Sequence, residues 1–185
     1  IRFLKDDPRY GGNTVMVGAP TGWRTGRRDA LPDPLLQETL RKADVISPWT
    51  VGRYATPYDV GQHIEKTIHP DLDWCDAEGK LFLPVAFPGF SWHNLKSRPG
   101  RVAPLNQIPR LKGVFFESQT KAYAEAGAES LYVAMFDEID EATAIFKCTN
   151  DPPVGESPFL TYEGLPSDHY LKLVGQAAQR LQERM

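Results

Sequence analysis

The chain has 185 residues, of which 41% are hydrophobic and 24% are charged, and its formal net charge is -3. This composition is typical of one globular domain around a single core and argues against disorder. A slight negative charge without any long Lys/Arg block argues against nucleic acid as a partner, and no apolar stretch approaches the roughly 20 residues of a membrane span.

Short apolar runs rich in β-forming residues recur along the chain, and each is bounded by Gly, Pro or charge. They cover residues 14–18, 44–49, 81–87 and 131–136, and a weaker one covers 159–162. We predict that each of the first four is a strand buried on both faces and that the weaker run is a fifth strand.

Helix-compatible segments lie between these runs, at residues 34–42, 57–68 and 117–126, and a last one covers 167–180. Ser167 is the expected cap of the last helix and Asp168 is expected in its first turn. One apolar stripe at helical spacing consists of Tyr170, Leu171, Leu173, Val174, Ala177, Ala178 and Leu181. Alternation of strand and helix predicts βαβ units, and hence an α/β fold with a parallel sheet.

The chemically rich segments follow the predicted strands, at residues 19–29, 48–54, 87–110 and 137–147. A (β/α)8 TIM barrel concentrates its chemistry on this face, whereas no Gly-rich fingerprint of a dinucleotide-binding sheet follows any strand. Because five strands and 185 residues fall short of a full barrel, we expect residues 1–185 to be a single domain that forms the later part, about strands 4 to 8. The apolar start at Ile1 leads us to expect that an N-terminal portion, with any targeting signal, precedes it.

Aromatic and polar side chains gather in these segments. The aromatic residues are Trp23, Trp49, Tyr54, Phe90 and Trp92, and the polar residues beside them are Arg24, Arg53, His93, Asn94, Asn106 and Arg110. Aromatic rings stack on the apolar faces of sugars, while guanidinium, amide and imidazole groups reach the hydroxyls. The alternative is that the rings cap the core and the charged groups are solvated. We predict that the set, apart from Asn106, binds substrate.

Four carboxylates, Asp137, Glu138, Asp140 and Glu141, follow the strand predicted at residues 131–136. Crowded carboxylates raise one another's pKa values, as proton-transferring groups require. A solvated acidic loop is the plain alternative. A Ca²⁺ site is another, although the spacing lacks the alternation and the Gly of an EF-hand loop, so we expect no metal and no cofactor. Cys75 and Cys148 are compatible with one disulfide, with two buried thiols, or with no functional consequence.

Five segments of the chain resemble the glycoside hydrolase family 71/99-like proteins, which include the endo-acting α-mannosidases and α-mannanases of glycoside hydrolase family 99. They are VMVGAPTGWRT (15–25), DVISPWTVGRY (44–54), LPVAFPGFSWHNL (83–95), NQIPR (106–110) and LYVAMFDEIDEATAIFK (131–147). The family-99 enzymes carry Glu-Trp-His-Glu-Gly-Thr where this chain has Glu138-Ile139-Asp140-Glu141-Ala142-Thr143. Both glutamates and the Thr match, whereas Ile139, Asp140 and Ala142 differ.

The resemblance implies catalytic roles for Glu138 and Glu141. Glu138 would deprotonate the sugar 2-hydroxyl, which then forms a 1,2-anhydro sugar, and Glu141 would protonate the departing oxygen and later activate water. Such a route retains stereochemistry without a covalent enzyme intermediate, unlike the usual retaining route. Asp137 and Asp140 are expected to contact substrate.

We therefore expect a retaining glycoside hydrolase of α-linked, mannoside-like oligo- or polysaccharides. The alternatives are a non-catalytic carbohydrate-binding barrel and an inactive fragment of the hydrolase. Expected partners are the saccharide and either a complementing N-terminal barrel segment or further copies of the chain. The resemblance implies a secreted or periplasmic protein.

Overall fold

The computed structural model describes residues 1–184 and contains five parallel strands. β1 (Met16–Pro20), β2 (Val45–Trp49) and β3 (Leu81–Phe82) form one sheet in that order. β4 (Val85–Ala86) and β5 (Tyr132–Val133) form a second, two-stranded sheet. The four strongest apolar runs of the sequence therefore do contain strands, and all their pairings are parallel, as predicted.

The two sheets are joined through the third apolar run, which is divided into β3 and β4 at Leu83 and Pro84. Proline has no N–H to donate to a neighbouring strand, which explains an interruption at this point. The Leu83 N–H still donates to the Ile46 carbonyl at 2.9 Å, and the Tyr132 N–H donates to the Pro84 carbonyl at 2.9 Å. The backbone thus connects all five strands, so their carboxyl ends lie along the same edge.

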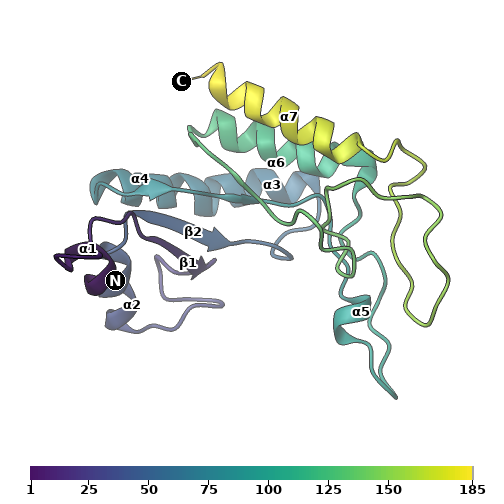
Figure 1. The fold of residues 1–185 in the computed structure, drawn as a ribbon, viewed down its shortest axis with the longest axis horizontal. Helices are drawn as coiled ribbons and strands as arrows, with labels where there is room; N and C mark the ends of the chain where they lie inside the picture. The colour runs from purple at the N-terminus through teal and green to yellow at the C-terminus, as the bar shows by residue number, and fades with distance from the viewer. Residues whose placement is uncertain (185) are drawn as a thin grey trace.

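Helices pack against these strands. α2 (Pro34–Arg41) follows β1, and after β2 come α3 (Pro57–His63), a π-helical turn η1 (Ile64–Ile68) and α4 (His69–Ala77) without a break. α6 (Val114–Glu125) and α7 (His169–Gln182) complete the layer. Figure 1 shows α3, α4, α6 and α7 stacked on the upper side of the strands.

Short elements lie outside this layer. α1 (Arg2–Asp6) carries no buried residue, and Phe3 is 59% exposed, so the apolar residues at the start of the chain are not interior ones here. α5 (His93–Lys96) stands on a lobe below the strands in Figure 1, and the 3-10 turn η2 (Leu111–Gly113) leads into α6.

Gln119 of α6 fastens the helix layer to the end of β4. Its side chain is fully buried, its Oε1 accepts from the Phe87 N–H at 3.1 Å, and its Nε2 donates to the Phe87 carbonyl at 2.7 Å. The Tyr54 hydroxyl also donates to Oε1 at 2.8 Å. One amide therefore satisfies both backbone groups of the residue that follows β4, which would otherwise be buried without partners.

Three details differ from the sequence prediction. Residues 159–162 form no strand; instead, the buried Tyr162 hydroxyl donates to the Ala144 carbonyl at 3.1 Å and anchors an irregular segment. α7 begins at His169 with Asp168 at its N-cap rather than Ser167. Ala178 is exposed and lies outside the buried stripe of α7.

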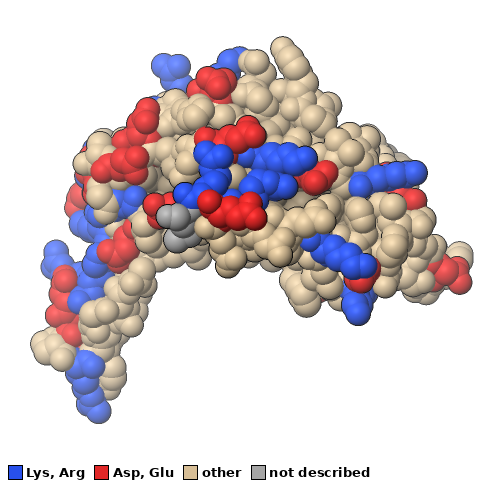
Figure 2. Space-filling view, turned by 90° about the horizontal axis from the view of Figure 1, so that it is seen from above, with Lys and Arg blue, Asp and Glu red and all other residues tan. Residues whose placement is uncertain are grey.

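β1 is not buried on both faces. Ala19 is buried, but Met16 is 52% exposed and Gly18 is exposed, because the helices cover only one side of the strand. The molecule has an arch-shaped outline with one hollowed side, as Figure 2 shows. The strands thus have one face covered by helices and one face that is partly open.

Replacing Gln119 with Met is expected to destabilise the fold. The substitution keeps the side-chain length but leaves the Phe87 N–H and carbonyl without partners, which costs roughly 2–4 kcal/mol of unfolding free energy. Urea denaturation measures the loss, with the exposed Gln176→Met on α7 as a control. Equal stabilities of the two variants would contradict the role of Gln119.

Candidate active site

The acidic residues lie on a tight loop that returns to the end of β5. The Phe136 carbonyl accepts from the Phe146 N–H at 2.9 Å, and the Glu138 carbonyl accepts from the N–H groups of Thr143 at 3.1 Å and Ala144 at 2.9 Å. The buried Thr143 hydroxyl also donates to the Glu138 carbonyl at 3.3 Å. The backbone of Glu138 is therefore fixed by three donors.

Ala142 closes the loop in a left-handed conformation, with φ at 59°. This backbone region favours glycine, the residue that the resembling enzymes carry at this point. Ala142 nevertheless keeps the turn, and its N–H donates to the Ile139 carbonyl at 3.1 Å. The turn geometry is thus available to the chain without glycine.

The four acidic side chains differ in burial. Glu138 and Glu141 are half-buried, whereas Asp137 and Asp140 are exposed. Partial burial raises the pKa of Glu141, and the negative charges of Glu138 and Asp140 raise it further. The structure therefore distinguishes the glutamates from the aspartates, and Glu141 is the group whose protonated form is favoured.

Residues from the segment after β4 hold this loop in place. The Ser91 N–H donates to the Glu141 carbonyl at 2.8 Å. The Asn94 side chain donates to the carbonyls of Asp140 at 3.4 Å and Pro158 at 3.0 Å. The predicted site residue Asn94 is thus placed beside the acidic loop, where it ties two loops together.

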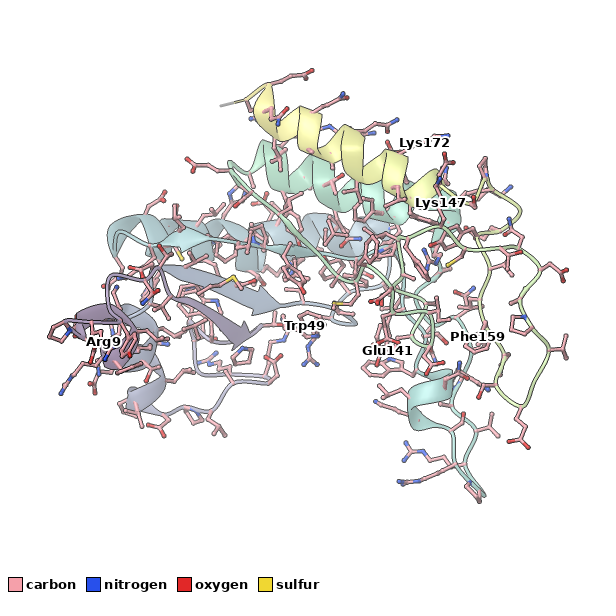
Figure 3. All side chains as sticks on the ribbon, in the orientation of Figure 1. Arg9, Trp49, Glu141, Lys147, Phe159 and Lys172 are labelled. Atoms are coloured by element: carbon pink, nitrogen blue, oxygen red, sulfur yellow. The ribbon has the colours of Figure 1, made fainter. Side chains whose placement is uncertain are left out.

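Trp49 and Arg53 lie at the end of β2 and line a cavity of about 490 Å³ on the open face of the strands, here called the concave cavity. Trp49 is 43% exposed and meets Tyr132 edge-on with ring centroids 6.4 Å apart. Figure 3 labels Trp49, the last residue of β2, and Glu141, on the loop after β5. Neither catalytic candidate lines the concave cavity.

Asp29 orients Arg53. The Arg53 Nη2 lies 2.8 Å from the Asp29 Oδ2, and the carboxylate also accepts from the N–H groups of Thr21 at 3.1 Å and Gly22 at 2.9 Å. Burial opposes ionisation of Asp29, but these backbone donors and Arg53 together lower its pKa. The guanidinium group is therefore held by a carboxylate that stays ionised.

Trp23 and Arg24 instead contact α4. Trp23 is fully buried, packs edge-on against Trp74 at 4.8 Å and donates from Nε1 to Asp71 at 3.1 Å. The Arg24 Nε lies 2.8 Å from the other oxygen of Asp71. Burial raises the pKa of Asp71 to about 6, although Arg24 and the hydrogen bond from Trp23 each lower it. These two residues join a loop to a helix.

Tyr54, Phe90 and Arg110 are also interior residues. Tyr54 is 7% exposed, Phe90 is 3% exposed, and the Arg110 guanidinium group lies over the rings of Tyr162 and Tyr170. Arg110 donates to the Ala144 carbonyl at 2.9 Å. A side chain closed off from solvent offers no surface to a sugar, so these residues, like Trp23, support the loops from behind.

Trp92 and His93 are half-buried at the start of α5. Trp92 packs edge-on against Phe90 with centroids 4.3 Å apart, and the Lys96 ammonium group lies 3.7 Å from the centre of its ring. The His93 Nδ1 is 2.7 Å from the Ala103 carbonyl. Asn106 was grouped with these residues by sequence, and its backbone N–H donates to the Ser91 hydroxyl at 3.2 Å.

Sequence reasoning missed the supporting residues Asp29, Asp71, Ser91 and Gln119. Each holds a predicted residue or its backbone through contacts between distant parts of the chain. No local motif marks them, although an acidic or amide residue within a helix stripe, as at Asp71 and Gln119, is a signal of a buried polar contact.

Among residues 1–184, no three His, Cys, Asp or Glu side chains are arranged to hold a metal ion. Cys75 and Cys148 are both free thiols. None of the helices in the described part of the chain is long and apolar enough to cross a membrane.

Parallel strands covered by helices on one side, with polar loops at the strand ends, define an α/β fold. Two solved structures share it, both of the glycoside hydrolase family 99 endo-α-mannosidase from Bacteroides thetaiotaomicron. One matches with a TM-score of 0.66 and 17% identity over 98% of this chain. The other, in complex with BIS-TRIS-propane, matches with a TM-score of 0.58 and 21% identity over 77% of this chain.

The chain has a fold like that of glycoside hydrolase family 99, and it spans 49% and 42% of the lengths of the two solved chains. No family model and no curated protein matches its sequence. At these identities the likeness shows the fold alone.

The pKa of Glu141 is expected to fall in Glu138→Gln and in Asp140→Asn, because each change removes a negative charge that disfavours its ionisation. Carboxyl ¹³C NMR titration measures this pKa. Asp137→Asn is the matched control, since Asp137 is not among the groups that raise the pKa of Glu141. An unchanged pKa in both of the first two variants would contradict the described electrostatics.

Replacing Arg24 with Met is expected to lower the unfolding free energy at pH 7 by roughly 1–3 kcal/mol, because Asp71 would remain buried and charged without its cation. The folded-state pKa of Asp71 lies above its ordinary value of 3.8, so its contribution to stability falls as pH rises from about 4 through about 6. Arg24→Met raises the pKa of Asp71 further and extends this fall to higher pH, so the loss is smaller at pH 5.

Urea denaturation at pH 5 and pH 7 tests the Arg24 prediction. Arg27→Met is the control, since Arg27 is exposed and forms no ion pair within residues 1–184. A loss of stability independent of pH would show that Arg24 acts through packing alone.

Proposed function

We propose that the chain is part of a retaining glycoside hydrolase that acts on α-linked, mannoside-like oligo- or polysaccharides. The observation that carries the proposal is the pair Glu138 and Glu141, half-buried on a fixed loop after β5, with the pKa of Glu141 raised. The fold, like that of an endo-α-mannosidase, supports this choice of reaction.

In the proposed mechanism, Glu141 is the general acid. A carboxyl group with a raised pKa stays protonated to higher pH and can give its proton to the departing glycosidic oxygen. Glu138 acts as the base that takes the proton from the sugar 2-hydroxyl. That oxygen attacks the anomeric carbon to give a 1,2-anhydro sugar, and Glu141 then activates the water that opens it.

The remaining candidates have different roles in this proposal. Trp49 and Arg53 are exposed at the concave cavity and are available to a sugar ring and its hydroxyls. Trp92, His93, Asn94, Asp137 and Asp140 surround or carry the acidic loop. Asp140 stands where the resembling enzymes have His and places a negative charge beside Glu141, which strengthens the case for Glu141 as the acid.

We further propose that the strands form the later part of a barrel, within about its strands 4 to 8; β3 and β4 come from one apolar run and residues 159–162 add no strand, so four strand positions are present. β1 and β5 each pair on one side only within residues 1–184, so further strands can add to both edges. A complementing barrel segment or a second copy of the chain would supply them. We also propose that the protein is secreted or periplasmic, because extracellular polysaccharide is reached outside the cytoplasm.

A second candidate function is saccharide binding without turnover. It is favoured by one observation: the concave cavity contains Trp49, Arg53 and Tyr132 but neither glutamate. Saccharide binding by the parent protein without any hydrolysis would favour this second candidate.

Glu138→Gln and Glu141→Gln are each expected to reduce hydrolysis of α-linked mannooligosaccharides by roughly 10²- to 10⁴-fold, since each removes a proton-transferring group. Product formation is measured by chromatography of the released sugars. Glu129→Gln, an exposed change before β5, is the matched control and should retain activity. Unchanged hydrolysis by both active-site variants would rule out the assigned roles.

A further inference from the structure

A second cavity lies between the loop after β1, the segment after β2 and the helix that runs from α3 into η1. Its volume is about 510 Å³, and Arg28, Arg53, His63 and Lys66 are among the residues that line it. A smaller cavity of about 140 Å³ adjoins it and shares Arg28, Lys66 and Thr67. We call the larger one the basic cavity.

The positive charge of the basic cavity is only partly compensated. Within residues 1–184, neither Arg28 nor Lys66 forms an ion pair, and Arg53 is held by Asp29 from outside the lining. The one acidic residue of the lining is Asp59, whose carboxylate already accepts from the N–H groups of Ala55 at 3.3 Å and Thr56 at 3.1 Å. Two free cations therefore face the same space.

His63 forms part of this wall, and its Nε2 is a buried polar atom. His63 is 7% exposed, and its ring stacks on the Tyr54 ring with centroids 4.7 Å apart. Its Nε2 has no hydrogen-bond partner within the described residues. Burial first, and the charge of Arg28 second, lower the pKa of His63 to about 4. The imidazole is therefore neutral at pH 7, and the charge of the cavity comes from Arg28, Arg53 and Lys66.

The backbone that presents the two free cations is irregular. Arg28 takes a left-handed conformation, with φ at 61°, which is uncommon for a residue with a side chain. Lys66 lies on the π-helical turn η1, and such turns occur frequently at functional sites. Both cations thus come from segments whose conformation the regular fold does not require.

We propose that the basic cavity binds a small oxyanion, either free phosphate or the phosphate group of a sugar phosphate. Guanidinium and ammonium groups are the preferred partners of phosphate, and the adjacent hydroxyl and amide groups of Thr67, Gln62 and Gln107 suit the polar remainder of such a ligand. The proposal does not depend on the hydrolase proposal, because neither Glu138 nor Glu141 lines this cavity.

Isothermal titration calorimetry in a phosphate-free buffer at pH 7 tests the proposal, with inorganic phosphate, glucose 6-phosphate and glucose as probes. We expect saturable binding of a phosphate-bearing probe and none of glucose. Arg28→Gln and Lys66→Gln should each weaken binding by about tenfold or more, as expected for loss of one charge-assisted contact. Arg27→Gln is the matched control, since Arg27 is exposed and lines neither cavity.

The outcomes are distinct. Tighter binding of glucose 6-phosphate than of phosphate would identify a sugar phosphate as the ligand, whereas equal binding would identify the free anion. A change in the ¹⁵N chemical shifts of the His63 ring on binding would place the ligand in this cavity. Absence of saturable binding, or equal weakening by Arg27→Gln, would overturn the proposal. Because all three variants change exposed side chains, circular dichroism should show the same fold for each.

Discussion

Parallel pairing of the strands is the constraint on which the rest of the structure depends. Because β1, β2, β3/β4 and β5 all run in the same direction, the segments that follow them leave along one edge of the sheet. The acidic loop, the Trp92 segment and the Arg53 segment therefore meet although they are far apart in sequence. Gln119 fastens this edge to the helix layer by satisfying both backbone groups of Phe87.

Buried polar contacts then determine which loop residues remain available. Asp71 draws Trp23 and Arg24 toward α4, and Asp29 holds Arg53 at the open face. Backbone carbonyls of the acidic loop accept hydrogen bonds from Ser91 and Thr143. The loop is thus held through its backbone rather than through the glutamate side chains. Positioning and chemistry are thus divided between different residues, as expected of a preorganised site.

The electrostatics of the two polar regions are opposite in sign. Around Glu141, burial and neighbouring carboxylates favour the protonated acid, whereas around His63, burial and Arg28 favour the neutral base. Each environment stabilises the uncharged form of one titratable group beside a cluster of uniform charge. The two regions lie on loops of the same edge. Arg53 and Trp92 line the basic cavity and are also candidates for binding the saccharide, whereas Arg28 and Lys66 are not among those candidates and can be altered separately.

The sequence by itself determined the order and position of the main strands and helices, because apolar periodicity and flanking Gly and Pro are local properties. It also marked the carboxylate cluster at residues 137–141, within which the resemblance to glycoside hydrolase family 99 singled out Glu138 and Glu141. Only the tertiary structure decided that Trp49 is exposed while Trp23 is buried, since the partner of Trp23, Asp71, is 48 positions away. The same holds for the open face of β1 and for the irregular segment at residues 159–162, because burial and strand pairing depend on what the rest of the chain brings alongside.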